Sequence, residues 1–172
     1  MTTHVKFDLR KATEVLLYIA SQVPDTYKAL KVLYFADKEH LARYGRLICG
    51  DSYVAMKHGP VPSGTYDLVK SSRVDGICSQ ELLRSASGAF TVDGNEIKVL
   101  RLANEDLLSD SDIECLEWAI KQYGQLSFSA LKRISHKEPA YVNADQDDFI
   151  PLEAIVDSLP NGEALKEYLW AD

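Results

Sequence analysis

The stretch Thr26–Tyr44, TYKALKVLYFADKEHLARY, predicts a long amphipathic helix. Its apolar positions recur at the spacing of one helical face; they are Leu30, Leu33, Tyr34 and Leu41. Pro24–Asp25 restarts the chain before this helix. Gly45 follows it, where a left-handed residue commonly ends a helix. We therefore expect this α-helix to be the main element of the fold.

Elements on both sides of this stretch are shorter. Upstream, Asp8 is a suitable N-cap for a helix, whose apolar face is formed by Leu9, Ala12, Val15, Leu16 and Ile19. Downstream, Cys49–Met56 predicts a short strand. The segment Gly59-Pro60-Val61-Pro62 cannot be helical, because each proline removes a backbone donor and restricts the residue before it. Ser63 is expected to cap the following helix.

The second half of the chain alternates turn signals with short helical patterns. Ala89–Leu100 predicts a β-hairpin around Asp93-Gly94-Asn95. Ser111 and Glu114 have the spacing of a capping box for a helix that ends at Gly124. Further helices are expected after Ser127, Pro139, Pro151 and Asn161-Gly162. The predicted fold is α+β and mainly α: a single compact helical domain, residues 1–172, with a small antiparallel sheet or hairpin.

Composition narrows the class of protein. The chain has 172 residues, 46% of them apolar and 26% charged, which is typical of a globular domain. The longest apolar run, Val15–Ala20, is far below the roughly 20 residues that a bilayer span needs. The charged N-terminus does not resemble a signal peptide. The three cysteines have no metal-ligand spacing and are expected to be reduced thiols, so we expect a cytoplasmic protein without a membrane contact.

Three groups of residues could carry chemistry. Asp37 and His40 lie one helical turn apart, and with His58 they could serve acid–base chemistry or bind a metal; alternatively, Asp37 anchors backbone donors of a loop. The turn Lys57–Pro62 and the pair Ser135-His136 resemble catalytic segments in outline. A triad is assembled from residues distant in the chain, however, and no nucleophile elbow or zinc-protease helix occurs. We therefore expect no catalytic residue, no metal site and no cofactor, with structural roles for these segments.

The same segments resemble a known family. The run Lys31–Leu41, followed by Tyr44-Gly45, Gly50-Asp51 and Tyr53–Ser63, is similar to the Panacea domain, also called the SocA-type antitoxin domain. Leu126-Ser127, Ser135-His136 and Pro139-Ala140 continue the likeness, and Tyr141 stands where family members often carry Trp. The resemblance spans about residues 9–160. The family-motif residues, for which we expect structural roles, are Asp37, His40, Tyr44, Asp51, Met56, Lys57, His58, Gly59, Pro60, Pro62, Ser135 and His136.

The resemblance implies a bacterial, phage- or plasmid-associated antitoxin that neutralises a cognate toxin protein by direct binding. Two alternatives stay open: an adaptor that delivers the toxin to a protease complex, and a phage-linked metal-dependent hydrolase that uses Asp37, His40 and His58. Some relatives carry an added DNA-binding segment. This chain starts almost directly at the domain, so DNA binding on its own is not expected.

Charge is divided unevenly between the two halves. The formal net charge is −7, with +4 on residues 1–74 and −11 on residues 75–172. Such a balance does not favour nucleic-acid binding, which needs clustered positive charge. Because acidic surfaces steer association with basic partners, Asp147 and Asp148 are expected to contribute to toxin binding.

Overall fold

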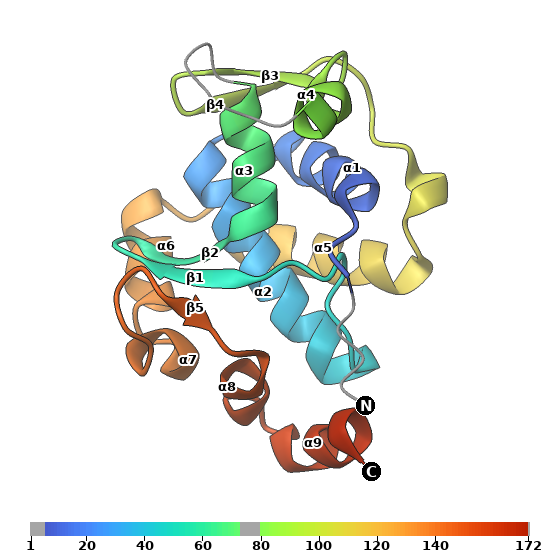
Figure 1. Ribbon diagram of the computed structural model, residues 1–172. Helices are drawn as coiled ribbons and strands as arrows, with labels where there is room; N and C mark the ends of the chain where they lie inside the picture. The colour runs from blue at the N-terminus through green and yellow to red at the C-terminus, as the bar shows by residue number, and fades with distance from the viewer. Residues whose placement is uncertain (1–5, 73–79, 172) are drawn as a thin grey trace.

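The computed structural model describes residues 6–72 and 80–171, and it confirms a mainly helical α+β fold (Figure 1). The helices are α1 (Leu9–Ala20), α2 (Thr26–Tyr44), α3 (Ser63–Ser71), α4 (Gln80–Ala86), α5 (Asp110–Tyr123), α6 (Phe128–Ser135), α7 (Pro139–Val142), α8 (Leu152–Asp157) and α9 (Gly162–Trp170), with a 3₁₀ turn η1 (Glu105–Leu107). The strands are β1 (Tyr53–Met56), β2 (Gly59–Pro62), β3 (Phe90–Asp93), β4 (Glu96–Val99) and β5 (Phe149–Ile150).

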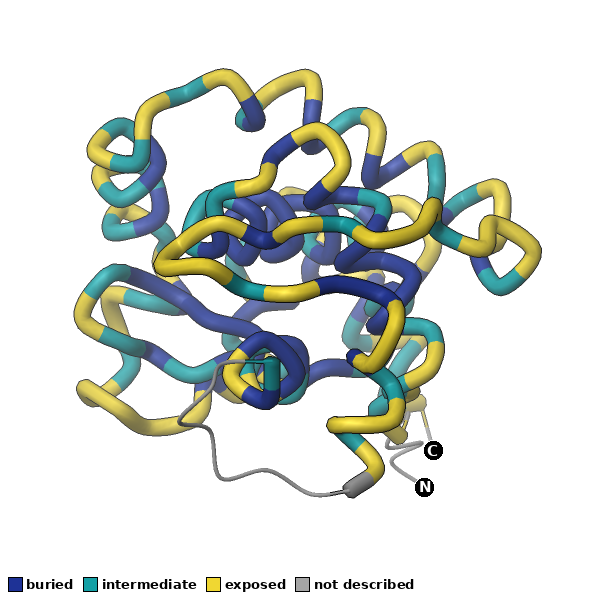
Figure 2. The backbone as a smooth tube through the Cα atoms, turned by 90° about the horizontal axis from the view of Figure 1, so that it is seen from above, coloured by how far each residue is buried: buried dark blue, intermediate teal, exposed yellow. Residues whose placement is uncertain are grey.

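Helix α2 lies at the centre of the molecule. Helices α1, α3, α5, α6 and α8 and strand β2 all contact it. Its buried residues therefore cover more than the predicted stripe and include Lys31, Val32, Phe35 and Asp37. Figure 2 shows the buried backbone gathered in the interior, with exposed loops around it. The helix is thus the scaffold on which polar motif residues are buried.

The predicted N-cap of α1 and the predicted bounds of α2 are confirmed. The Asp8 carboxylate accepts a hydrogen bond from the Lys11 backbone N–H at 3.0 Å, as an N-cap does. Gly45 ends α2 in the left-handed conformation, with φ +70°. A positive φ is accessible to glycine without a Cβ clash, which explains the abrupt end of the helix.

A three-stranded antiparallel sheet has the strand order β2-β1-β5. Strand β1 begins at Tyr53, whereas the sequence predicted a strand that starts at Cys49, so the prediction was four residues too long at its start. Pro60 and Pro62 lie in β2, an edge strand. Prolines are tolerated there because an edge strand leaves N–H groups without a ladder partner. The β1–β2 turn, residues 56–59, projects over α6 (Figure 1).

Helix α3 is capped differently from the prediction. Ser63 is the first residue of the helix and makes no side-chain cap bond; Pro62 precedes it. The Asp51 carboxylate instead accepts hydrogen bonds from the backbone N–H groups of Gly64 (2.8 Å) and Thr65 (2.9 Å). A residue twelve positions earlier therefore satisfies the free donors of the first turn, and no local spacing rule indicates such a cap.

The β3–β4 hairpin is confirmed, with Asp93 paired to Glu96 and the turn at Gly94. A bridge between Asp25 and Glu96 ties it to the start of α2. The capping box of α5, in contrast, is formed by Ser109 and Asp112, and the predicted box of Ser111 and Glu114 was wrong. The reason is that the helix begins two residues earlier than predicted.

The remaining turn signals were correct. The Ser127 hydroxyl caps α6 by accepting from the Ala130 N–H at 3.1 Å. Pro139 is at the start of α7, where its missing N–H has no consequence. Pro151 precedes α8, and Gly162 starts α9.

Candidate functional site

The motif residues lie in two groups around α2. The first group surrounds its C-terminal half and includes Asp37 and His40, with Asp51 close by in the loop before β1. The second lies where the β1–β2 turn contacts α6 and α7, near Lys31. The fold thus places most motif residues at junctions between elements.

Asp37 is a buried anchor for the loop before β1. It is 1% exposed, and its two carboxylate oxygens accept hydrogen bonds from the Ile48 backbone N–H at 2.8 Å and from the Tyr53 hydroxyl at 2.6 Å. Burial raises the pKa of Asp37 to about 7, although both hydrogen bonds oppose this rise. The geometry matches the expectation that Asp37 holds backbone donors of a loop.

His40 belongs to a separate network between α2 and α5. One imidazole nitrogen pairs with the Arg46 carbonyl at 2.9 Å, and the other lies 2.9 Å from the Ser111 hydroxyl. Burial lowers the pKa of His40. Asp112, also fully buried, accepts from Lys11 (2.7 Å) and Arg46 (3.1 Å) and lies beside the imidazole. These contacts fasten α1 and the loop after α2 to α5.

The contacts of His58 lie outside the Asp37 and His40 networks. Its ring packs edge-on against Phe128, with 5.6 Å between ring centroids, and lies near Tyr27. Asp37, His40 and His58 therefore have different partners. In the described part of the chain, no three His, Cys, Asp or Glu side chains are placed to hold a metal ion. Asp37, His40 and His58 are thus not brought together at one site.

The β1–β2 turn is held by α2, α6 and α7. Lys31 is 2% exposed and donates to the Pro60 carbonyl at 3.0 Å, and burial lowers its pKa to about 7. A Cβ added to Gly59 would lie 2.5 Å from the Ser135 hydroxyl and 2.9 Å from the Lys31 ammonium group. Only glycine can occupy this position in the observed packing.

A second contact closes the same turn. The Tyr141 hydroxyl donates to the Met56 carbonyl at 2.9 Å, and the Tyr141 ring stacks on His136 with 4.9 Å between centroids. His136 is also hydrogen-bonded to the Lys57 backbone. The aromatic residue at position 141 thus supports the turn by stacking and by one hydrogen bond.

The other predicted site residues lie nearer the surface. Tyr44 is 44% exposed and donates to Glu114 at 2.6 Å. Asp147 and Asp148 are exposed in the loop before β5, and the Asp147 backbone N–H donates to Ala55 of β1 at 2.7 Å. Asp147 has φ +64°, a conformation that Asp tolerates better than most residues. The Asp147 carboxylate accepts from the Gln146 side chain at 3.1 Å and the Asp148 carboxylate from the Phe149 N–H at 2.8 Å, and both side chains remain exposed.

The sequence analysis did not single out three buried polar residues, Lys31, Asp112 and Glu14. Lys31 stands in the run Ala29–Leu33, and a lysine inside an apolar helical run is a signal that could have indicated burial. Asp112 and Glu14 gave no such signal, because both lie at positions that also suit an exposed helical residue. Their burial depends on elements distant in the chain.

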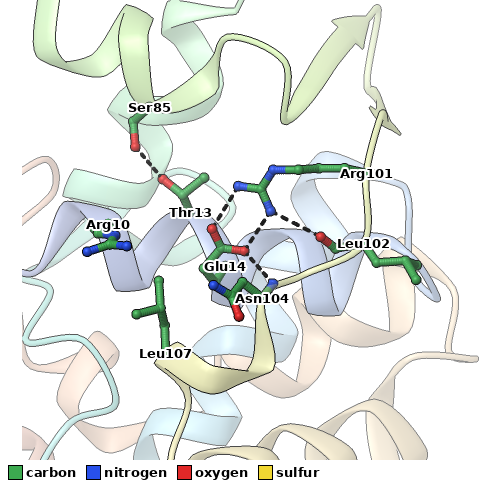
Figure 3. Close-up of a pocket in the computed structure, with 8 residues that line it drawn as sticks. All are labelled: Arg10, Thr13, Glu14, Ser85, Arg101, Leu102, Asn104 and Leu107. Atoms are coloured by element: carbon green, nitrogen blue, oxygen red, sulfur yellow. Dashed lines mark hydrogen bonds and ion pairs between the residues drawn. The ribbon is translucent and has the colours of Figure 1, made fainter.

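Glu14 lies beside a polar cavity of about 520 Å³ (Figure 3). Both its oxygens accept from Arg101, at 2.7 and 2.9 Å, and one also accepts from the Asn104 backbone N–H at 2.7 Å. The hydrogen bond from Arg101 is the main cause of the lowered pKa of Glu14. Thr13 and Ser85 join α1 to α4 across the same cavity, at 2.6 Å. The carboxylate is fully used in tying the segment after β4 to α1.

Together these observations define a mainly helical α+β protein whose motif residues join loops and turns to a central helix. Within residues 6–72 and 80–171, no helix has both the length and the apolarity to cross a bilayer. The chain belongs to the family described as antitoxin SocA-like, Panacea domain, whose model matches residues 30–141. The resemblance drawn from the sequence is thereby confirmed. Comparisons with curated proteins and with solved structures give no match.

Proposed function

We propose that this protein is a cytoplasmic antitoxin of a bacterial, phage- or plasmid-associated toxin–antitoxin system, and that it neutralises one cognate toxin by direct binding without catalysis. The family match over residues 30–141 carries this proposal. The use of the motif residues supports it, since Asp37, His40 and Asp51 are spent on internal contacts that make the loops rigid. A rigid surface loses less conformational entropy when it binds a partner.

The function is tested by expressing the small open reading frame adjacent to this gene. We expect the neighbouring product to arrest growth when it is expressed alone, and co-expression of this chain to restore growth. The two proteins should also co-purify as a complex. Growth arrest that persists despite full expression of this chain, or the absence of a complex, would contradict the proposal.

Toxin half-life distinguishes masking from delivery to a protease. If binding alone neutralises the toxin, its half-life in cells should be unchanged or longer when this chain is present. A half-life shortened by this chain, and restored in protease-deficient cells, would instead assign the adaptor function. Both outcomes need a complex, so neither can be confused with failure to bind.

The acidic loop before β5 gives a further prediction. Because acidic side chains steer basic partners, Asp147→Asn with Asp148→Lys should slow association with the toxin by about three- to tenfold at low salt and flatten its salt dependence. Asn is chosen at position 147 because, like Asp, it tolerates a positive φ. Stopped-flow or biosensor association rates at two salt concentrations measure the effect.

A matched control changes the same charge elsewhere. Asp93→Asn with Glu96→Lys alters two exposed carboxylates of the β3–β4 hairpin by the same amount. We expect its association rate to stay near that of the native protein. Equal slowing by both variants would assign the effect to net charge, and equal native rates would show that the acidic loop takes no part in binding.

A further inference from the structure

Basic groups gather where the β1–β2 turn meets α6. Lys57 is exposed at the turn, and Lys132, His58 and His136 are half-buried. Lys31 lies beneath them against Gly59. We call these five residues the hairpin-turn cluster. Lys31 is buried, whereas Lys57 is open to solvent.

The lysines of this cluster form no ion pair with a carboxylate within residues 6–72 and 80–171. None of the ion pairs among the described residues includes Lys31, Lys57 or Lys132. The charged groups that act on His58 are Lys132, Lys57, Lys31 and His136; Lys132 and Lys31 act on His136. Lys57 and Lys132 are therefore cations without an ion-pair partner among the described residues, in a chain with a net charge of −7.

Two imidazole nitrogens of the cluster are without partners. The Nδ1 atom of His58 and the Nε2 atom of His136 are buried and make no hydrogen bond within the described residues. Buried polar atoms are normally hydrogen-bonded, and each exception calls for an explanation. A protonated imidazole can donate from both nitrogens. If the imidazole took up a proton together with an anion, its unpartnered nitrogen would gain an acceptor and its positive charge would gain a counter-ion.

We propose that the hairpin-turn cluster binds an oxyanion, a phosphate group or a carboxylate, between Lys57 and Lys132, with His58 and His136 as proton-carrying donors. The contributing groups come from the β1–β2 turn, from α2, and from α6 and its C-cap, so the fold and not one local segment builds the site. Charge-assisted hydrogen bonds to several donors are the usual means of holding such a group. Binding is coupled to proton uptake, and affinity rises as the pH falls.

The test follows the histidine ring signals by NMR across pH 5.5–8.5 in sulfate, in acetate and in chloride at equal ionic strength. Sulfate serves as the phosphate probe because its charge is constant over this range. We expect sulfate to raise the pKa of His58 and His136 by about one pH unit relative to chloride. His40 is the internal control: it is buried between α2 and α5 with both nitrogens occupied, and its signals should not respond.

The two anions distinguish the source of the oxyanion. A larger effect of sulfate than of acetate assigns a phosphate group, and an equal effect assigns a carboxylate, such as an acidic side chain of a bound protein. Lys57→Ala with Lys132→Ala should weaken sulfate binding at least about tenfold in calorimetry, because two charged donors are removed. Lys166→Ala, in α9, removes a lysine outside the cluster that pairs with Asp157 and Glu163, and should leave binding unchanged.

Either of two results would overturn the proposal. One is a pKa of His58 and His136 that is the same in sulfate, acetate and chloride. The other is a lysine double variant that folds, with native thermal stability, and binds sulfate as the native protein does.

Discussion

Gly59→Ala is expected to destabilise the protein by about 2–6 kcal/mol. The residue has φ +112°, where an L-residue is strained by about 1–3 kcal/mol. The new methyl group would also lie 2.5 Å from the Ser135 hydroxyl and 2.9 Å from the Lys31 ammonium group, and overpacking of this kind costs about 1–3 kcal/mol more. Thermal unfolding should show a midpoint lowered by roughly 5–15 °C.

Gly88→Ala separates backbone strain from crowding. Gly88 also has a positive φ, +74°, but a Cβ there would meet no atom within 4 Å. Its replacement should therefore cost only about 1 kcal/mol. Adding Ser135→Ala to Gly59→Ala removes the closest contact and should recover part of the loss. Equal destabilisation by Gly59→Ala and Gly88→Ala would refute the crowding at the β1–β2 turn.

Asp37→Ala is expected to destabilise the protein by about 1–3 kcal/mol, with or without a partner. The Ile48 N–H and the Tyr53 hydroxyl would lose their acceptor in the interior, and buried donors without partners cost this much. Chemical denaturation at pH 7 measures the change. Asp67→Ala, an exposed carboxylate of α3, is the control and should change stability by less than about 0.5 kcal/mol. An unchanged midpoint for Asp37→Ala would refute the anchoring role.

The Asp37 carboxyl also makes the free energy of unfolding depend on pH, and its burial fixes the sign of this dependence. The folded pKa of Asp37 is raised to about 7, whereas its ordinary value is 3.8. Between these values the folded chain holds a proton that the unfolded chain has lost, so the free energy of unfolding contributed by Asp37 falls as the pH rises from about 4 to 7. Asp37→Asn lacks this dependence. Native and Asp37→Asn stability curves that stay parallel between pH 5 and pH 8 would contradict the raised pKa.

Local signals in the sequence were sufficient for most helices and for the β3–β4 hairpin. Asp8, Gly45, Ser127 and Pro139 act within a few residues of themselves, so their effects can be read from spacing. The capping of α3 was not accessible in this way, because Asp51 reaches it across an intervening hairpin. The start of α5 was misplaced because two serine–acid pairs compete within six residues, Ser109–Glu114.

For the candidate site, too, some features could be predicted from the sequence and others only from the tertiary structure. The motif in the sequence identified the family, and it offered Asp37 as an anchor for backbone donors of a loop, a contact that Asp37 makes with Ile48. Which residues meet was decided by the tertiary structure. Packing of α6 and α7 against the β1–β2 turn brings Ser135 and His136 to Gly59 and Lys57, more than 70 residues away in the chain.

By itself, the sequence determined the fold class, most helix ends and the family, because these depend on periodicity and on interactions between near neighbours. Only the tertiary structure decided that Lys31 and Asp112 are buried, that His40 and His58 lie in separate networks, and that a basic cluster forms at the turn. Burial and charge balance are set by whichever elements pack on a residue from elsewhere in the chain. A linear pattern contains no record of those contacts.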